Sequence, residues 1–443
     1  MNNLYTLEKI DIDKFQISKA KLDHYFEQNI SKYSDFNYLY WDKIKFQPVP
    51  KGFKDSKDLW GTIKFMRTLN YVSPIKTDSG EFFRFGELEF SKKLLHEIDK
   101  NASGTFYTPF SESDKRLFVT NGMLEEAISS SQLEGASTTS RNAVKMIKQG
   151  IKPKNDSDRM ILNNYEVMYF VKDELVKKEK IDESDLLYLQ EILTKGVIEN
   201  KGEIGRFRDI NDDNKDPIVV KFKGKIAHEP MKSEKMRVEL KRLIDFMNDE
   251  GDFNTFVHPV IKAIVIHFWI GYLHPFCDGN GRTARALFYW YLLKNDYFGF
   301  SFIPLSSIIK KSKIEYAKSY IYSEQDDRDL GYFINYNLRK IKIALDAFQS
   351  DLKNRFKDNH SNLKDLRHLD LNDRQKKLLK YFLENKDSFT NSLIHKNYYN
   401  ISKPTAVSDL NILRKKGLIY STKSGRNISY FPVENLENLI KKD

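Results

Sequence analysis

Hydrophobic residues recur at helical spacing along most of this chain. Between Asp55 and Leu69, for example, Leu59, Ile63 and Met66 fall on one face of a helix. The same spacing predicts further helices over residues 121–136, Met160–Lys178, Glu183–Thr194, Ser233–Met247, Pro259–Leu273, Arg282–Leu293, Glu315–Glu324 and 332–357. The pattern therefore predicts a mainly helical fold, preceded by a mixed N-terminal region.

One interruption of the helical pattern predicts a hairpin. Gly202, Gly205 and the polar stretch Asp209–Asp216 indicate a break between helices. Ile218–Phe222 is short and rich in β-branched residues, and it is bounded by Pro217 and Gly224. These features predict a strand in a hairpin or flap.

A different pattern follows a polar linker predicted at Asp358–Asp370. Helices are predicted at Asn372–Glu384 and Asn391–Lys396, and a third begins after Ser402 as N-cap. Two short strands, Leu418–Tyr420 and Ile428–Phe431, come next. This order resembles a winged helix-turn-helix, a module that binds DNA or mediates protein contacts. The candidate DNA-binding residues are Lys403, Thr405, Asn411 and Arg426.

The length of the chain favours several domains, and its single cysteine favours a reducing compartment. The 443 residues exceed what one core usually serves. We expect an accessory region at 1–115, a central domain at 116–357 and the winged helix at 371–435. Cys277 is the single cysteine, which excludes an internal disulfide. The N-terminus lacks a signal-peptide pattern, so we expect a cytoplasmic protein.

Membrane insertion is not expected from the most apolar segment. Residues 257–276 include Lys262, His267 and His274, which predicts a buried core helix. The net charge of +11 and the isoelectric point of about 9.1 favour anionic partners such as nucleotides or nucleic acid. A solvated, lysine-rich surface explains the same charge, so this observation alone decides nothing.

The residues with the clearest chemical meaning run from His274 to Arg285, His-Pro-Phe-Cys-Asp-Gly-Asn-Gly-Arg-Thr-Ala-Arg. An imidazole with a reference pKa near ~6.5 accepts a hydroxyl proton at neutral pH, so His274 is the candidate general base. Asp278 offers the hard oxygen ligand that Mg²⁺ prefers when phosphates supply the other ligands.

The rest of this segment has the composition of a phosphate site. Gly279, Asn280 and Gly281 allow successive amides to face an anion at the start of the next helix. Arg282 and Arg285 are three residues apart on that helix, so both can reach one polyphosphate. Singly, the histidine could be a packed or capping residue and Gly-Asn-Gly only a turn. Their contiguous order favours the phosphate site.

The same twelve residues match the core motif of the Fic domain family. The resemblance covers about residues 110–345 and implies an all-helical core with a β-hairpin flap. It also implies transfer of AMP from ATP, with Mg²⁺, to a hydroxyl side chain of a target protein or of the chain itself. By this resemblance, His274 deprotonates the hydroxyl and Asp278 holds magnesium. Asn280 and the glycines Gly279 and Gly281 cradle the phosphates, Arg282 assists, and Arg285 meets the γ-phosphate.

A second stretch, Ser130-Ser-Gln-Leu-Glu134-Gly135, resembles the inhibitory motif of the family. The resemblance implies that Glu134 pairs with Arg285 and prevents the γ-phosphate from binding in a reactive pose. The predicted inhibitory helix spans about residues 121–136. The alternative interpretation is that Glu134 is an ordinary carboxylate at a helix end.

The flap and the adenosine pocket are assigned through the same resemblance. Gly205–Arg208 and Ile218–Pro230 are similar to the flap region, although Glu229-Pro230 stands where the family often has two prolines. An edge strand there would align a target segment with His274. Tyr316 matches a position near the adenosine, or else is a plain core aromatic. The flap residues assigned to ATP binding are Gly224, Lys225, Ile226 and Ala227.

Two other functions stay open from the sequence. A glutamate at position 134 could instead orient water for removal of AMP from a modified hydroxyl. Alternatively, the central domain could sense ATP while the winged helix regulates transcription. Family members of this architecture are often dimers, so a homodimer is one possible partner, but the sequence leaves the oligomeric state open. The sequence does not identify the target protein.

Overall fold

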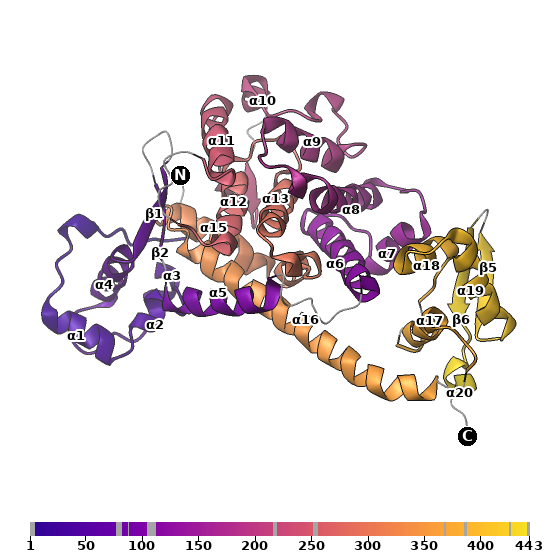
Figure 1. Ribbon diagram of the computed structural model, residues 1–443. Coiled ribbons are helices and arrows are strands. Elements are labelled where there is room, and N and C mark those ends of the chain that lie inside the picture. The colour runs from indigo at the N-terminus through magenta and orange to yellow at the C-terminus, as the bar shows by residue number, and fades with distance from the viewer. Residues whose placement is uncertain are drawn as a thin grey trace. The chain divides into compact units, whose positions relative to one another are not determined.

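The computed structural model describes residues 5–76, 82–86, 88–103, 112–215, 219–250, 256–366, 369–384, 388–424 and 427–440. Over these residues the chain is mainly helical, as predicted, and its strands form three two-stranded sheets (Figure 1). The chain divides into two compact units. The first contains residues 1–108, 122–143 and 153–345, and the second contains residues 109–121, 144–152 and 346–443.

Helices make up most of the first unit. They are α6 (Glu112–Leu133), α7 (Ser140–Gln149), α8 (Asp156–Asp173), α9 (Glu183–Thr194), α10 (Ile210–Lys215), α11 (Ser233–Met247), α12 (Pro259–Leu273), α13 (Asn280–Lys294), α14 (Leu305–Lys310), α15 (Lys313–Gln325) and α16 (Gly331–Asp365). Three of these helices, α6, α7 and α16, also contribute residues to the second unit. The predicted helices at 183–194, 233–247 and 259–273 are confirmed at both ends.

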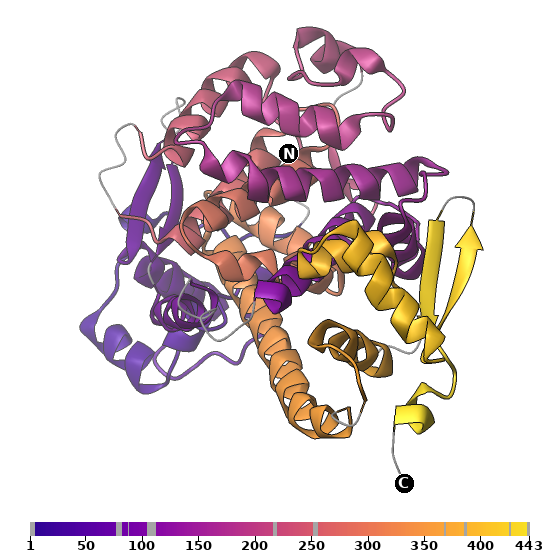
Figure 2. The same ribbon diagram turned by 45° about the vertical axis from the view of Figure 1, so that its right-hand side comes forward.

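Two neighbouring helices, α12 and α13, form the centre of this unit (Figures 1 and 2). Every residue from Val260 to Ile270 is buried, so α12 has no polar face, as expected of a helix surrounded by others. Trp269 and Trp290 are fully buried. The expectation of a core helix is therefore confirmed, and no helix among the described residues has the length and apolarity to cross a membrane.

The N-terminal part of the first unit mixes helices with a hairpin. Its elements are α1 (Lys19–Glu27), α2 (Ser31–Ser34), α3 (Trp41–Ile44), α4 (Ser56–Thr68), β1 (Tyr71–Lys76), β2 (Phe82–Gly86) and α5 (Glu89–Ala102). The predicted helix at 55–69 is confirmed as α4. It begins where the Asp55 side chain accepts a hydrogen bond from the Asp58 amide at 2.8 Å, a typical N-cap.

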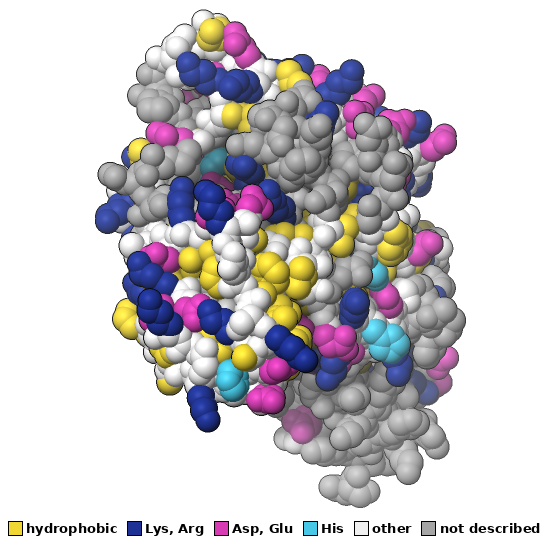
Figure 3. All heavy atoms as spheres, turned by 90° about the vertical axis from the view of Figure 1, so that its left-hand side faces the viewer, with side chains coloured by type: hydrophobic (Ala, Val, Ile, Leu, Met, Phe, Trp, Pro, Cys, Tyr) yellow, Lys and Arg dark blue, Asp and Glu magenta, His cyan; other side chains and the backbone are white. Residues whose placement is uncertain are grey.

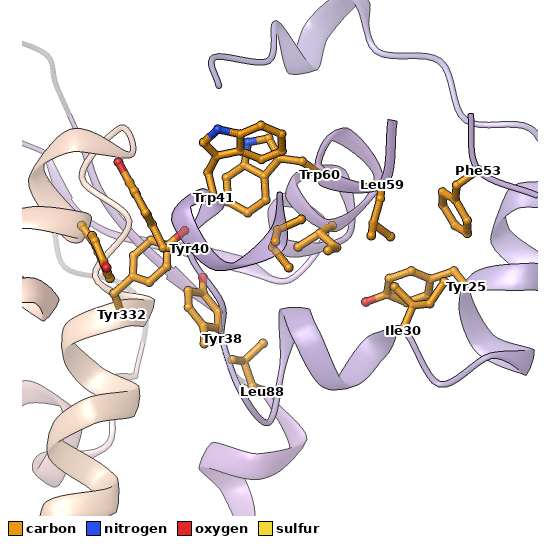
Figure 4. Close-up of a cluster of buried hydrophobic side chains, with 13 residues drawn as sticks. Tyr25, Ile30, Tyr38, Tyr40, Trp41, Phe53, Leu59, Trp60, Leu88 and Tyr332 are labelled. Atoms are coloured by element: carbon orange, nitrogen blue, oxygen red, sulfur yellow. The ribbon is translucent and has the colours of Figure 1, made fainter. Parts of the chain in front are cut away.

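Aromatic side chains dominate the core of this N-terminal part (Figure 4). Trp60 is fully buried, and the ring of Tyr40 stacks on Tyr322 of α15 at a centroid distance of 4.0 Å. Tyr332 of α16 belongs to the same cluster. These contacts fasten the N-terminal part to the helical body of the unit. On the outside, hydrophobic side chains lie among lysines and acidic residues (Figure 3).

Several predicted boundaries differ from the structure. The helix predicted at about 121–136 is α6, which begins earlier, at Glu112, and ends at Leu133. The polar stretch predicted as a break contains α10. Asp209, the residue before this helix, accepts from the amides of Asn211 and Asp212 and so starts it. The helix predicted at 160–178 ends at Asp173. The linker predicted at 358–370 is helical to Asp365, because no glycine or proline interrupts α16 after its first residue.

The hairpin in the first unit consists of β3 (Val220–Phe222) and β4 (Lys225–His228). The strands are antiparallel, with Phe222 opposite Lys225, and the turn is made by Lys223 and Gly224, both at positive φ. The prediction of a strand is confirmed for Val220–Phe222, while Ile218 lies outside the described residues.

The second unit contains the C-terminal elements in the predicted order. They are α17 (Asp373–Glu384), α18 (Ser392–Tyr399), α19 (Lys403–Lys415), β5 (Ile419–Ser424), β6 (Asn427–Pro432) and α20 (Leu436–Ile440). The predicted N-cap is confirmed, since Ser402 Oγ accepts from the Thr405 amide at 3.2 Å. Asp409 joins three helices, because Arg374 of α17 and His395 of α18 both contact its carboxylate.

Candidate active site

The candidate site lies where α12 ends and α13 begins. His274 is the C-cap of α12 and adopts a left-handed conformation with φ of 49°. This conformation is unusual for a residue with a side chain. Arg208 holds it, since its Nε donates to the His274 carbonyl at 2.8 Å and its own amide donates to the Pro275 carbonyl at 2.9 Å.

The ring of His274 has the tautomer that a general base needs. Its Nδ1 lies 3.3 Å from the carbonyl oxygen of Gly271. A carbonyl only accepts, so Nδ1 carries the hydrogen and Nε2 carries the lone pair. Burial lowers the pKa of His274 to about 4. The ring is therefore neutral at pH 7 and able to accept a proton at Nε2.

The loop between the two helices leaves the first amides of α13 accessible to an anion. Gly279 is the N-cap of α13 with φ of 90°, and it has no side chain with which to cap the helix. Asn280 folds back on Phe276, accepting from its amide at 2.9 Å and donating to its carbonyl at 2.7 Å. Asn280 thus shapes the loop with its side chain, and only its main-chain amide remains for a phosphate.

A carboxylate of the chain lies beside these amides. Glu134 is so near Gly281 that a Cβ on residue 281 would collide with the Glu134 carboxylate. The approach therefore requires the glycine. A negative charge at a helix N-terminus is favoured by the orientation of the amides and by the helix dipole. Glu134 is thus placed in the region where the sequence predicts phosphate.

Glu134 is also paired with Arg285 of α13. Arg285 Nη2 donates to Glu134 Oε1 at 2.8 Å and to the Ser130 carbonyl at 3.1 Å, and Nε donates to Ser130 Oγ at 2.7 Å. The Arg285 side chain is buried, whereas that of Glu134 is 36% exposed. Burial alone would raise the pKa of Glu134, but Arg285 more than offsets it, so the pKa is lowered. The predicted pair is present and charged.

The end of α6 fixes where Glu134 lies. Gly135 has φ of 102°, a conformation that favours glycine, and the Ala136 amide donates to the Ser131 carbonyl at 3.0 Å. This is the hydrogen bonding of a helix that ends at a left-handed glycine. Ser130, Glu134 and Gly135 of the predicted motif therefore act together, since the glycine ends the helix directly after the carboxylate.

Arg282 and Asp278 contact each other. Arg282 Nη2 lies 3.0 Å from Asp278 Oδ2, and Nη1 donates to the Leu193 carbonyl at 2.9 Å. The Arg282 side chain is buried, and its guanidinium ties the loop to α9. Asp278 is 51% exposed. One accessible carboxylate fits a magnesium ion that takes its other ligands from substrate phosphates and water.

The residues assigned to ATP in the flap and on α15 lie on two different elements. Gly224 is in the β3–β4 turn, Lys225 and Ile226 on β4 are exposed, and Ala227 is partly buried. Tyr316 is held in a buried cluster, where its hydroxyl lies 2.9 Å from His267 Nε2. Burial raises the pKa of Tyr316 and lowers that of His267 to about 3, so both are neutral.

Two buried side chains that the sequence did not single out, those of Gln190 and Glu126, support the site. Gln190 of α9 donates to the Asp278 carbonyl at 3.3 Å and accepts from the Gly205 amide at 2.6 Å. Glu126 lies on α6, eight residues before Glu134, and its carboxylate accepts a hydrogen bond from the Tyr289 hydroxyl of α13 at 2.8 Å. Glu126, Ser130 and Glu134 are each four residues apart, and this spacing could have indicated that one helix face meets α13.

A second group of potential metal ligands does not fit a metal ion. Glu203, Asp212 and Cys277 converge in the described part of the chain. Arg206 already binds both oxygens of Asp212, at 2.6 and 2.8 Å. Burial and the charge of Asp212 raise the pKa of Cys277 to about 12, so its thiol is protonated. A metal would require the thiolate.

The candidate DNA-binding residues lie in the second unit. Lys403 is exposed at the start of α19, Thr405 is partly exposed in its first turn, and Asn411 is partly exposed farther along. Lys403, Asn411 and Lys415 line one hollow on this helix. Arg426 lies outside the described residues.

Comparisons with known proteins agree with this geometry. Residues 180–292 match the model of the Fic/DOC family. The chain is 30% identical over 142 residues, or 32% of its length, to Protein adenylyltransferase Fic of Drosophila willistoni. It is 22% identical over 264 residues, or 59% of its length, to the protein of that name from Nematostella vectensis.

These alignments span 26% and 56% of the two relatives, less than two thirds of either. The fold is similar to that of a Fic family protein from Desulfovibrio desulfuricans, with a TM-score of 0.50 and 18% identity, over 78% of this chain and 95% of that chain. The family match covers both α12 and α13, which carry the candidate site. The chain therefore contains a Fic domain.

Proposed function

We propose that the chain is a protein adenylyltransferase that transfers AMP from ATP to a hydroxyl side chain of a protein. The observation that carries the proposal is the arrangement around α13. His274 is neutral and has a lone pair on Nε2, and it lies just before the N-terminus of α13. The Glu134 carboxylate lies against this N-terminus and is bound by the buried Arg285. A base beside an anion site is what attack of a hydroxyl on a phosphate requires. The names of the relatives support the same activity.

The reaction follows from these groups. His274 Nε2 takes the proton of the target hydroxyl, whose oxygen attacks the α-phosphorus. The bond from the α-phosphorus to the bridging oxygen breaks, and pyrophosphate leaves. Magnesium, held by Asp278 and the phosphates, would neutralise charge on the leaving group. The amides at Gly279–Gly281 and the guanidinium of Arg285 would orient the polyphosphate.

Glu134 restrains this activity in the proposed mechanism. Its carboxylate lies against Gly281 and binds Arg285, so a γ-phosphate that needs Arg285 must first displace it. ATP bound without Arg285 would present its α-phosphate poorly to His274, because a small misplacement of reacting atoms costs much of the rate. The resting chain is thus inhibited by its own helix end.

Intact mass spectrometry tests both parts of the proposal. Glu134→Gly and the double variant Glu134→Gly/His274→Ala are incubated with magnesium and ATP, alone and with a cell extract labelled from α-³²P ATP. Of the two variants, only Glu134→Gly should attach AMP to protein. The wild type should attach much less AMP than Glu134→Gly. Equal labelling by both variants would exclude His274 as base, and loss of AMP from modified proteins would favour AMP removal instead.

Charge favours a second role for the C-terminal domain, and we propose that residues 371–435 form a winged helix that binds DNA. This segment has twelve lysines and arginines against five acidic residues, so its net charge of +7 is most of the chain's +11. Lys403 and Lys415 lie on the exposed side of α19, the helix that such domains place in the major groove. Phosphate contacts from this face would give salt-dependent binding.

A gel shift measured at several salt concentrations tests the second role. Lys403→Ala/Arg426→Ala should bind duplex DNA about tenfold more weakly and with a smaller salt dependence. Lys376→Ala/Lys377→Ala, on α17, is the matched control for a change of two charges. Equal loss in both pairs would indicate non-specific attraction. The domain limits 1–115 and 116–357, a cytoplasmic location and a homodimer stay predictions.

A further inference from the structure

A second histidine lies close to the candidate base and takes no part in the proposed reaction. His228 is the last residue of β4, the return strand of the flap hairpin. Its side chain is only 9% exposed. Because the strand before it presents exposed residues to solvent, His228 is the point at which the flap enters the protein core.

Both ring nitrogens of His228 face hydrogen-bond acceptors. Nδ1 lies 2.7 Å from Glu324 Oε2, and Nε2 lies 2.7 Å from the carbonyl oxygen of Tyr272. A carbonyl cannot donate, and a carboxylate cannot donate either. Two short contacts of this kind therefore require a hydrogen on each nitrogen, which makes the ring an imidazolium. Charge-assisted bonds of this length are about twice as strong as neutral ones.

The charges around His228 are consistent with a cation. Burial alone would lower the pKa of His228, but Glu324 and the Tyr272 carbonyl raise it above its usual value. Arg208 opposes the charge from the loop before α10, and His274 lies nearby beyond the end of α12. The cation also lies at the C-terminal end of α12, where carbonyls are left without helical partners and positive charge is favoured.

The two acceptors belong to different helices of the site. Tyr272 is in the last turn of α12, two residues before His274, and Glu324 is in the last turn of α15, the helix that carries Tyr316. One ring therefore joins the flap, the helix that ends at the base and the helix beside the proposed adenosine pocket. Removing the charge would loosen the flap without touching the residues that bind phosphate.

We propose that His228 is a positioning residue, a fixed imidazolium that anchors the flap to the end of α12 and sets its place relative to His274. Its effect on AMP transfer rests on the proposed function, whereas the anchor itself does not. The anchor keeps the edge of the hairpin at a constant distance from His274 Nε2. Its positive charge also opposes protonation of His274 and so adds to the larger effect of burial on the pKa of that ring.

The protonation of His228 can be measured without any activity. Long-range ¹H–¹⁵N spectra of the full chain, assigned by the signal lost in His228→Gln, should show two protonated ring nitrogens at about pH 7.5. In Glu324→Gln the carboxylate is replaced by an amide of the same shape, and one nitrogen should lose its proton. One bare nitrogen on His228 in the wild type would overturn the proposal.

The anchor can be measured by hydrogen exchange of the hairpin. In His228→Gln, amides of Val220–Phe222 and Lys225–His228 should exchange about tenfold faster, the loss expected from one charge-assisted hydrogen bond. His96→Gln, at an exposed position of α5, is the matched control and should leave the hairpin unchanged. Unchanged exchange in folded His228→Gln and Glu324→Gln would also overturn the proposal.

The consequence for the reaction is measured in the Glu134→Gly background. Adding His228→Gln should raise KM for the protein target about tenfold, while ATP affinity stays within about twofold. A fall in kcat with unchanged KM for the target would contradict a positioning role. If Glu134→Gly shows no AMP transfer, the proposed function fails, but the spectra and the exchange rates still decide whether the anchor exists.

Discussion

Two buried arginines of the first unit have contrasting partners. Arg67 of α4 donates to the Tyr332 hydroxyl at 2.7 Å and to the carbonyls of Tyr33 and Leu39 at 3.1 and 2.8 Å, and its guanidinium lies 3.8 Å from the centroid of the Tyr38 ring. Arg285 is equally buried, but one of its partners is the partly exposed carboxylate of Glu134.

The difference shows which buried arginine can exchange its partner for a ligand. The partners of Arg67 are main-chain carbonyls and packed aromatic rings, none of which can leave without unfolding the surrounding core. Glu134 lies directly after a helix end and is open to water on one side, so it can leave Arg285 and be hydrated. Burial of a charge therefore does not itself mark a functional site. The solvent exposure of the group paired with it is the better indicator.

Removing Arg67 should have the largest effect. Arg67→Met leaves two carbonyls and a tyrosine hydroxyl without their donor, so the free energy of unfolding should fall by ~3–5 kcal/mol. All four tryptophans belong to the first unit, so urea unfolding followed by tryptophan fluorescence reports this unit. Arg141→Met, at an exposed position, should change stability by less than ~0.5 kcal/mol. If Arg67→Met were as stable as Arg141→Met, the contacts of Arg67 would not hold the core together as described.

Removing Arg285 should cost less stability and more function. In Arg285→Met the carboxylate of Glu134 can turn to water, so we expect a loss of only ~1–3 kcal/mol. Nucleotide binding should weaken by at least about tenfold, because the γ-phosphate loses its guanidinium. The same fluorescence experiment and calorimetric titration with ATP measure both effects. A stability loss larger than that of Arg67→Met would reverse the comparison.

Neutralising Glu134 while keeping its size isolates the exchangeable partner. Glu134→Gln should raise ATP affinity about fivefold to tenfold, the ~1 kcal/mol expected for a partly solvated ion pair. Stability should hardly change. Glu125→Gln, nine residues earlier on the same helix, is the control for a lost carboxylate. An affinity increase of the same size in the control would indicate a general effect of charge.

The smallest effect is expected from pH. The pKa of His274 is lowered to about 4. The base is therefore neutral through the usual histidine range, and the Glu134→Gly variant lacks the carboxylate that raises this pKa. Its kcat/KM should vary less than about twofold between about pH 5.5 and 7.5. An inflection near the ordinary histidine pKa, about 6.5, would contradict the burial of this ring.

The lowered pKa of His274 also makes the free energy of unfolding depend on pH. A histidine that is harder to protonate when folded binds fewer protons than it does unfolded. Its contribution to folding is therefore complete above the unfolded pKa, about 6.5, and is lost as pH falls toward about 4. His274→Ala should make the unfolding free energy of the first unit less sensitive to pH in this window.

The sequence predicted most helices and the residues of the site, because each carried a local signal. Pro259, the apolar run to Leu273 and Gly279 mark where α12 and α13 begin and end. The pairing of Glu134 with Arg285 followed from the resemblance of two stretches of this chain to two motifs of the Fic family. No local signal could show that the Asn280 side chain turns back on Phe276, since this depends on the loop geometry.

The supporting residues were hidden for a similar reason. Arg208 and His228 are distant in sequence from the main-chain oxygens they bind, and any residue can supply a carbonyl oxygen. Side-chain pairs can be recognised from residue types, whereas contacts between a side chain and the backbone cannot. The N-terminal hairpin β1–β2 was missed because the sequence of β1 contains Pro74, and a proline within a run argues against a strand.

In the proposed mechanism, the placement of Glu134 directly after α6 makes the inhibitor a part of the chain. A free inhibitor can be diluted, but a carboxylate joined to its own site has an effective concentration set only by geometry. ATP therefore competes with the Glu134 carboxylate, whose effective concentration does not depend on how much protein the cell makes. Relief must come from moving the end of one helix, and the strength of inhibition can be tuned by how firmly that helix is packed.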